Sequence, residues 1–268
     1  MHPTLNTAVK AARAASKVIN RASMDVSTLK VTVKQQSDFV TEVDQNAEAA
    51  IIDILQHAYP QYGILAEESG LAGTNPDAEF QWIIDPLDGT TNFIHGVPQY
   101  AISIGLAQRG VMMSAVVYDP NRNELFTASK GAGAFLNNKR IRVSKRTKLA
   151  DTLIGTGFPY RMFDHIDAYL AIFKDMAKNT AGMRRPGAAS LDLAWTACGR
   201  MDGFWELGLS PWDIAAGSLL ITEAGGLVGD LSGETDYMNT GNIIGANPKI
   251  FSQMLQLIAP HRTAALNA

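Results

Sequence analysis

The sequence is poor in cysteine and in long apolar segments, and both shortages restrict what the chain can be. One cysteine, Cys198, stands among 268 residues, so neither an intramolecular disulfide nor a thiolate metal cluster can form. No apolar run approaches the ~18 residues that would suggest a membrane span. The N-terminal segment carries Lys10, Arg13 and Lys17 where a signal peptide would have an uninterrupted apolar stretch. We therefore expect a cytoplasmic protein with no membrane partner.

The chain also lacks a large excess of positive or of negative charge. Charged residues make up 18% of the chain and the formal net charge is −3, whereas binding to a nucleic-acid backbone needs clustered Lys and Arg. The most basic stretch, residues 139–148, alternates in a way that predicts a solvated strand edge, where charge discourages pairing with another sheet. None of the five histidines is spaced as a metal ligand with another His or a Cys, which argues against zinc.

Apolar residues are plentiful, at 46%, which is enough for one large core or two fused smaller ones. Their periodicity predicts helices at residues 4–22, 41–59, 164–177, 187–198, 211–223 and 248–258. An antiparallel meander is expected at 101–107, 112–118, 124–129 and 134–143, with further strands at 64–66, 81–84, 153–154, 203–207, 227–228 and 243–244. This order indicates layered helices and sheets and differs from a Rossmann or barrel repeat. With no linker stretch visible, we expect a single domain, residues 1–268, with two fused lobes at about 1–150 and 151–268.

An acidic segment follows the strand predicted at 81–84. Asp85 ends that strand, Pro86 is expected to stop it, and Asp88 comes three residues later. Two carboxylates and a backbone carbonyl at a strand end are hard oxygen ligands, which suit Mg²⁺ better than Zn²⁺. Gly89 and Thr90 then open a turn and a helix start, whose N–H groups suit a phosphate. Taken alone, however, Asp85 and Asp88 could equally form an Asx-type turn.

Two other acidic sites have the same character. Glu67 and Glu68 lie at the end of a short apolar strand, which is a common place for catalytic groups. Asp213 follows Ser210 and Pro211 at the spacing of a helix N-cap and N3 position. A carboxylate at N3 stabilises a helix without any further role, so both a cap and a metal ligand are open for Asp213.

In combination, these segments resemble the inositol monophosphatase family. The resemblance rests on Asp-Pro-Leu-Asp-Gly-Thr-Thr at 85–91, on Glu67-Glu68-Ser69 before it and on Trp-Asp-Ile-Ala-Ala-Gly at 212–217 after it. It extends from the first helix to Asn247-Pro248, and it includes 38–41 with Asp44, Gly157-Phe158-Pro159 and 223–226. Such a resemblance implies an α+β fold, a layered α-β-α-β-α sandwich with a large antiparallel sheet and a second, smaller mixed sheet.

The resemblance also implies a Mg²⁺-dependent, lithium-inhibited phosphatase that hydrolyses an inositol monophosphate or a similar small polyol or sugar phosphate, as a homodimer. Two ions would be held by Glu67, Asp85, the carbonyl of Leu87, Asp88 and Asp213, with Asp85 bridging. A third, looser ion would be reached through Glu67, and Mn²⁺ is expected to substitute for Mg²⁺.

The same resemblance assigns the remaining site residues. A metal-acidified water would lose its proton towards Thr90, which Asp44 orients, while Glu67 helps to place that water. Asp44 could instead be only a first-turn helix carboxylate. The substrate would contact Asp88, Gly89, Thr90, Gly187, Ala189, Glu206 and Asp213. Glu206 is expected to accept hydrogen bonds from polyol hydroxyls, unless it is only an exposed carboxylate at a strand end.

Two positions depart from the family pattern. Gln36 stands where a Gly is common, near the expected third ion, and Pro186 stands where Thr, Phe or Val is common, at the start of a substrate-side helix. Rival substrates are a sugar bisphosphate, a 3′-phosphoadenosine nucleotide and histidinol phosphate. The rival of another class is a binding role in RNA processing or transcription complexes, which could use the basic stretch at 139–148.

Overall fold

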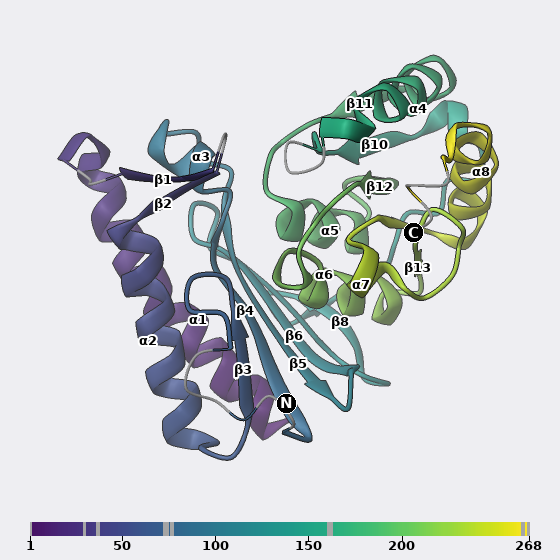
Figure 1. The fold of residues 1–268 in the computed structure, drawn as a ribbon. Coiled ribbons are helices and arrows are strands. Elements are labelled where there is room, and N and C mark those ends of the chain that lie inside the picture. The colour runs from purple at the N-terminus through teal and green to yellow at the C-terminus, as the bar shows by residue number, and fades with distance from the viewer. Residues whose placement is uncertain are drawn as a thin grey trace.

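The computed structural model describes residues 2–28, 31–35, 38–71, 75, 78–159, 163–263 and 266. Within them, layers follow one another in the order helix, sheet, helix, sheet, helix (Figure 1). Two N-terminal helices cover one face of the large sheet, two central helices lie between the sheets, and two more pack against the small sheet. The predicted α+β class and layer order are confirmed. None of the helices in these ranges is long and apolar enough to cross a membrane.

The large sheet has seven strands in the order β3-β4-β5-β6-β7-β8-β9. The edge strand β3 pairs with β4 in parallel, and all other neighbours are antiparallel, as the predicted meander requires. The bounds are β3 Gly63–Ala66, β4 Phe80–Asp88, β5 Ala101–Gln108, β6 Val111–Asp119, β7 Glu124–Ser129, β8 Gly133–Leu136 and β9 Lys139–Arg140.

Strand β4 is longer than the sequence predicted, because Pro86 does not stop it. The register of β4 against β5 shifts between Asp85 and Asp88. Such a bulge leaves a residue out of the hydrogen-bonded ladder, so a proline without an N–H is tolerated there. The strand therefore continues through Leu87, and both carboxylates of the acidic segment lie on it.

The strand expected at 134–143 was also wrong, since the structure has a hairpin there. Asn137 and Asn138 have φ angles of 47° and 65°, and two consecutive positive φ angles are typical of the tight turns that join antiparallel strands. Asparagine tolerates this conformation better than most residues. The hairpin makes β9 the edge strand of the large sheet, so the basic stretch begins at a sheet edge as predicted.

Helices α1 (Pro3–Ala22) and α2 (Glu42–Ala58) cover the first face of the large sheet. The buried stripe of α1 is built mainly from alanines, namely Ala8, Ala11, Ala12 and Ala15. Small side chains allow α1 to lie close to its neighbours. Ile51 and Leu55 of α2 are fully buried in the same core. Thr41 and Asp44 form a capping box at the start of α2.

Between the sheets lie α5 (Ala189–Ala197) and α6 (Pro211–Glu223). Both helices are apolar on nearly all sides, which is typical of helices buried on two faces. The small sheet has the order β11-β10-β12-β14-β13, with bounds β10 Leu153–Thr156, β11 Gly182–Arg184, β12 Gly203–Glu206, β13 Leu227–Gly229 and β14 Ile243–Ala246. It is mixed, because β10 pairs in parallel with β11 and β12 while β14 is antiparallel to β12 and β13.

Helices α4 (Ile166–Asn179) and α8 (Pro248–Ile258) pack against the small sheet. The short elements are β1 Val31–Gln35, β2 Asp38–Thr41, α3 Thr90–Ile94, α7 Tyr237–Thr240 and 3-10 segments at Ser23–Thr28, Leu149–Asp151, Phe163–His165 and Ala259–His261. The β1-β2 hairpin, β11 and α7 had no counterpart in the sequence prediction, because each is short and has little apolar periodicity.

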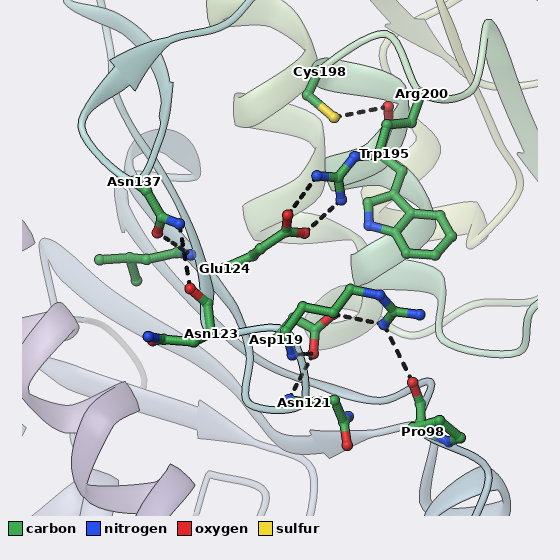
Figure 2. Close-up of polar contacts among 11 residues, drawn as sticks. Pro98, Asp119, Asn121, Asn123, Glu124, Asn137, Trp195, Cys198 and Arg200 are labelled. Atoms are coloured by element: carbon green, nitrogen blue, oxygen red, sulfur yellow. Dashed lines mark hydrogen bonds and ion pairs between the residues drawn. The ribbon is translucent and has the colours of Figure 1, made fainter.

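A polar cluster ties the central helix layer to the large sheet (Figure 2). Arg200, just after α5, donates to both carboxylate oxygens of Glu124 at the start of β7. This bidentate pairing holds the pKa of Glu124 below its usual value. The guanidinium groups of Arg122 and Arg200 both lie over the Trp195 ring, at 5.1 and 5.8 Å from its centroid, a cation–π arrangement that adds to the contact.

Candidate metal centre and active site

Three aspartates from distant parts of the chain meet at the ends of β4 and α6. Asp85, Asp88 and Asp213 each offer a carboxylate oxygen, and these atoms lie within 4.8 Å of one another. All three side chains are buried. We call this set the acidic group. It lies in a cleft lined by Glu67, Leu87, Gly89, Thr90, Thr91, Asn92, Phe158, Arg185, Gly187, Ala188, Ala189, Glu206, Leu207, Gly208 and Leu209.

Asp85 takes part in a local turn as well as in the acidic group. The Leu87 N–H donates to Asp85 Oδ1 at 3.0 Å, which is an Asx turn. The Asx-turn alternative is therefore observed, and the metal-ligand interpretation stays a prediction. Burial raises the pKa of Asp85 well above its usual value, and the negative charges of Glu67, Asp88 and Asp213 raise it further.

Asp88 accepts hydrogen bonds from the first turn of α5. Its Oδ2 accepts the Ser190 N–H at 2.7 Å and the Ser190 hydroxyl at 2.5 Å. Burial and the charge of Asp213 nevertheless raise the pKa of Asp88 to about 7, against the lowering effect of these bonds.

Asp213 caps α6 and also lies in the acidic group, and its role as a metal ligand stays a prediction. As the N3 residue of α6 it accepts the Ser210 N–H at 2.7 Å, and the capping box with Ser210 is complete. The same carboxylate belongs to the acidic group.

Thr90 and Asp44 form a second polar unit next to the acidic group. The Thr90 hydroxyl lies 2.8 Å from Asp44 Oδ1 and 3.0 Å from the Leu87 carbonyl oxygen. Asp44 Oδ2 accepts from the Thr41 N–H and hydroxyl at 2.8 and 2.6 Å, so this carboxylate both caps α2 and contacts Thr90. Burial raises the pKa of Asp44 despite these hydrogen bonds.

Glu67 borders the acidic group without belonging to it. Its backbone N–H donates to the Ile84 carbonyl at 3.1 Å, which fixes the residue beside β4, and its side chain is half-buried in the cleft. Glu68 is held in a different way, because its N–H donates to Glu48 Oε2 at 2.9 Å. Of the two glutamates, the cleft wall therefore includes Glu67 alone.

The other sequence-predicted residues also reach the cleft. Gly89, Gly187, Ala189 and Glu206 all line it, whereas Asp44 lies behind Thr90. Glu206 is 5% exposed, so it is not the exposed strand-end carboxylate that the alternative required. A Cβ at Gly157 would lie 1.9 Å from Glu206 Oε1, so only glycine leaves room for this carboxylate.

Sequence reasoning missed three contributors to the site. Ser190 contacts Asp88 as described above, and Asn92 Nδ2 donates to the carbonyls of Gln99 and Pro186 at 2.7 and 2.9 Å. The Arg185 guanidinium lies 5.4 Å from the centre of the Phe158 ring at the cleft wall. These contacts join segments far apart in the chain, and no local pattern signals them.

The two departures from the family pattern lie at the start of the substrate-side helix, at Pro186, and in the loop that contains Gln36. The helix expected at 187–198 begins later, at Ala189, because Gly187 has a φ angle of +93°, which no right-handed helix allows. Gln36 and Ser37, in the loop expected near a third ion, lie outside the described residues.

The composition of the acidic group fits a hard divalent cation. Its donors are carboxylates, and the Leu87 carbonyl lies next to them in the cleft lining. Burial raises the pKa of Asp85 and of Asp88, and repulsion from the neighbouring negative charges raises both further. A bound divalent cation would remove that repulsion, and an oxygen-only donor set suits Mg²⁺.

The family match, a sequence relative and two solved structures agree with one another. Residues 1–264 match the sequence profile of the inositol monophosphatase family. A putative Nus factor SuhB of Neisseria meningitidis serogroup B is 53% identical over 261 residues, which cover 97% of this chain and all of that protein.

Two solved structures are similar over almost their whole length. The extragenic suppressor protein suhB of Bartonella henselae is 41% identical with a TM-score of 0.92, covering 96% of this chain and 98% of the other. An inositol monophosphatase from Anabaena (Nostoc) sp. PCC 7120 is 39% identical with a TM-score of 0.87, covering 97% of each chain.

Proposed function

The chain belongs to the inositol monophosphatase family, and we propose that it is a Mg²⁺-dependent phosphomonoesterase. Its proposed substrate is myo-inositol monophosphate or a similar small polyol phosphate, which it converts to the free polyol and phosphate. The observation that carries this proposal is the acidic group, three buried carboxylates within 4.8 Å in a cleft that also contains Thr90 and Glu206. Lithium inhibition, a homodimer and a cytoplasmic location stay predictions from the family resemblance.

The proposed cation ligands fall into two sets that share Asp85. One set is Glu67, Asp85 and the Leu87 carbonyl, and the other is Asp85, Asp88 and Asp213. Bound Mg²⁺ would stabilise the charge of the transferring phosphoryl group and lower the pKa of a water. The protein's part is to hold these oxygens in place, through the Asx turn at Asp85 and the capping box at Asp213.

The proposed proton path uses the Thr90–Asp44 unit. The Thr90 hydroxyl has one proton and two acceptors within 3.0 Å, Asp44 Oδ1 and the Leu87 carbonyl. We propose that Thr90 Oγ1 accepts the proton of the attacking water while its own proton moves to Asp44 Oδ1. The raised pKa of Asp44 favours its holding that proton.

The proposed substrate contacts line the same cleft as the acidic group. Gly89 has a φ angle of +94°, and a Cβ there would lie 2.9 Å from the Gln99 carbonyl. Glycine thus permits the tight turn that presents the N–H groups of Gly89 and Thr90 to a phosphate. Glu206 is proposed to accept hydrogen bonds from ring hydroxyls of the polyol.

The test is a phosphate-release screen with Mg²⁺ over a panel of phosphomonoesters. The panel holds inositol monophosphates, a sugar bisphosphate, a 3′-phosphoadenosine nucleotide, histidinol phosphate and an aryl phosphate. We expect the highest kcat/KM for an inositol monophosphate. A clear preference for one of the other three metabolites would leave the reaction class intact and replace the substrate.

Glu206→Ala removes the carboxylate that is proposed to accept hydrogen bonds from substrate hydroxyls. It should lower kcat/KM for inositol monophosphate by about 10-fold or more, a loss of transition-state stabilisation on the order of 1.4 kcal/mol. A site built to bind a hydroxyl discriminates through that bond. Hydrolysis of a plain aryl phosphate should change little, because the acidic group and Thr90 stay in place. Equal losses on both substrates would mean that Glu206 supports the site as a whole and does not recognise hydroxyls.

The name of the Neisseria relative favours a second candidate function, association with a transcription complex. The candidate surface is the basic stretch at 139–148, whose Lys139, Arg140, Arg142, Lys145 and Lys148 are exposed beside the sheet edge. A metal-site variant and a variant with reversed charges in this stretch separate the two functions. The first should lose hydrolysis and retain association, and the second should do the opposite.

A further inference from the structure

The N-terminus of α5 has no capping side chain of its own. Its N-cap residue, Ala188, makes no side-chain hydrogen bond. The first N–H groups of a helix have no acceptor within the helix, so another group must accept their hydrogen bonds. Asp88, 102 residues earlier in the chain, accepts one of these bonds, at 2.7 Å, from the Ser190 N–H. Asp88 is thus at once a member of the acidic group and the cap of a helix in the next layer.

Ser190 adds a second bond to the same oxygen. Its hydroxyl donates to Asp88 Oδ2 at 2.5 Å, and the side chain is fully buried. A carboxylate oxygen has about two lone-pair sites, and these two donors occupy those of Oδ2. The backbone of Ala189 also hydrogen-bonds to the Asp88 carboxylate. The Ser190 hydroxyl adds a side-chain bond to these backbone bonds, and it therefore restricts rotation of the carboxylate more than the backbone donors alone.

We propose that Ser190 is a positioning residue for the divalent cation that Asp88 binds. The inference rests on the metal site of the proposed function. The hydroxyl of Ser190 holds Asp88 in the orientation in which its carboxylate lies within 4.8 Å of those of Asp85 and Asp213, and metal affinity depends on that orientation. Partners that orient a metal ligand in this way typically change metal affinity by about 10-fold to 100-fold when they are removed.

The test is Ser190→Ala, which removes the hydroxyl and retains the N–H that caps α5. Calorimetric titration of the metal-free protein with Mg²⁺, and separately with Mn²⁺, should show affinity at the Asp88 site weakened by about 10-fold. The readout is binding, so it does not depend on any substrate. Melting temperature in EDTA reports whether the variant is folded.

Ser218→Ala is the matched control. Ser218 is also a buried helical serine, 1% exposed, but its hydroxyl donates to the Ala215 carbonyl within α6 at 2.9 Å. This variant should bind both cations as the wild type does. If Ser190→Ala does not fold, Ser190→Cys replaces it, since a thiol is a weak donor of similar size and a smaller weakening is expected.

The outcomes separate this inference from the proposed function. Unchanged affinity in Ser190→Ala, or equal weakening in Ser190→Ala and Ser218→Ala, overturns the positioning role and leaves the metal site standing. A wild-type protein that binds neither cation overturns the proposed function, and this inference with it. Selective weakening in Ser190→Ala supports both.

Discussion

Chelation of divalent cations is expected to abolish phosphate release from inositol monophosphate, and added Mg²⁺ is expected to restore it. The physical reason is the acidic group: buried carboxylates within 4.8 Å repel one another and an incoming phosphate unless positive charge lies between them. Activity assayed after dialysis against EDTA, then with Mg²⁺ returned, measures the effect.

The choice of cation gives this prediction its controls. An oxygen-only donor set should accept Mn²⁺ with partial activity, and the family resemblance adds inhibition by Li⁺ and by excess Mg²⁺. Circular dichroism of the EDTA-treated protein should show an unchanged fold, since the apolar cores are independent of the cation. Full turnover after exhaustive chelation would contradict the whole mechanism.

Asp88→Asn is expected to lower kcat/KM by about 100-fold or more. The change removes one negative charge from the acidic group, and a loss of ~3 kcal/mol of transition-state stabilisation corresponds to about that factor. The fold should persist for two reasons. The asparagine oxygen can still accept both Ser190 donors. The substitution also removes a charge that is disfavoured by burial and by repulsion from Asp213, the two effects that raise the pKa of Asp88.

Asp119→Asn is the matched control for this substitution. Asp119 is a fully buried carboxylate as well, but it accepts from the backbone N–H groups of Asn121 and Arg122 and pairs with the Arg122 side chain (Figure 2). Its loss should lower the melting temperature and leave kcat/KM near the wild-type value. If Asp88→Asn showed near wild-type turnover, Asp88 would be a turn and capping residue only.

Several parts of the structure could be predicted from the sequence because their causes are local. Helices α6 and α8 begin and end at the predicted residues, since Ser210 and Asn247 are N-caps and a proline follows each of them. The candidate site is also local in large part. Asp85, Asp88 and Thr90 lie within six consecutive residues. Their types and spacing therefore already indicate oxygen ligands for a cation next to a turn whose N–H groups could bind a phosphate.

What only the tertiary structure decided depends on contacts between distant segments. Asp88 and Ser190 are 102 residues apart, and they meet because α5 packs between the two sheets with its N-terminus at the end of β4. In the same way Glu206 reaches the cleft because Gly157, on another segment, leaves room for its carboxylate. The sequence by itself determined which groups are available for the proposed chemistry, since periodicity, caps and turns act over a few residues. The packing of the layers decided how those groups are oriented, because the free energy of such packing belongs to many residues at once and leaves no local pattern.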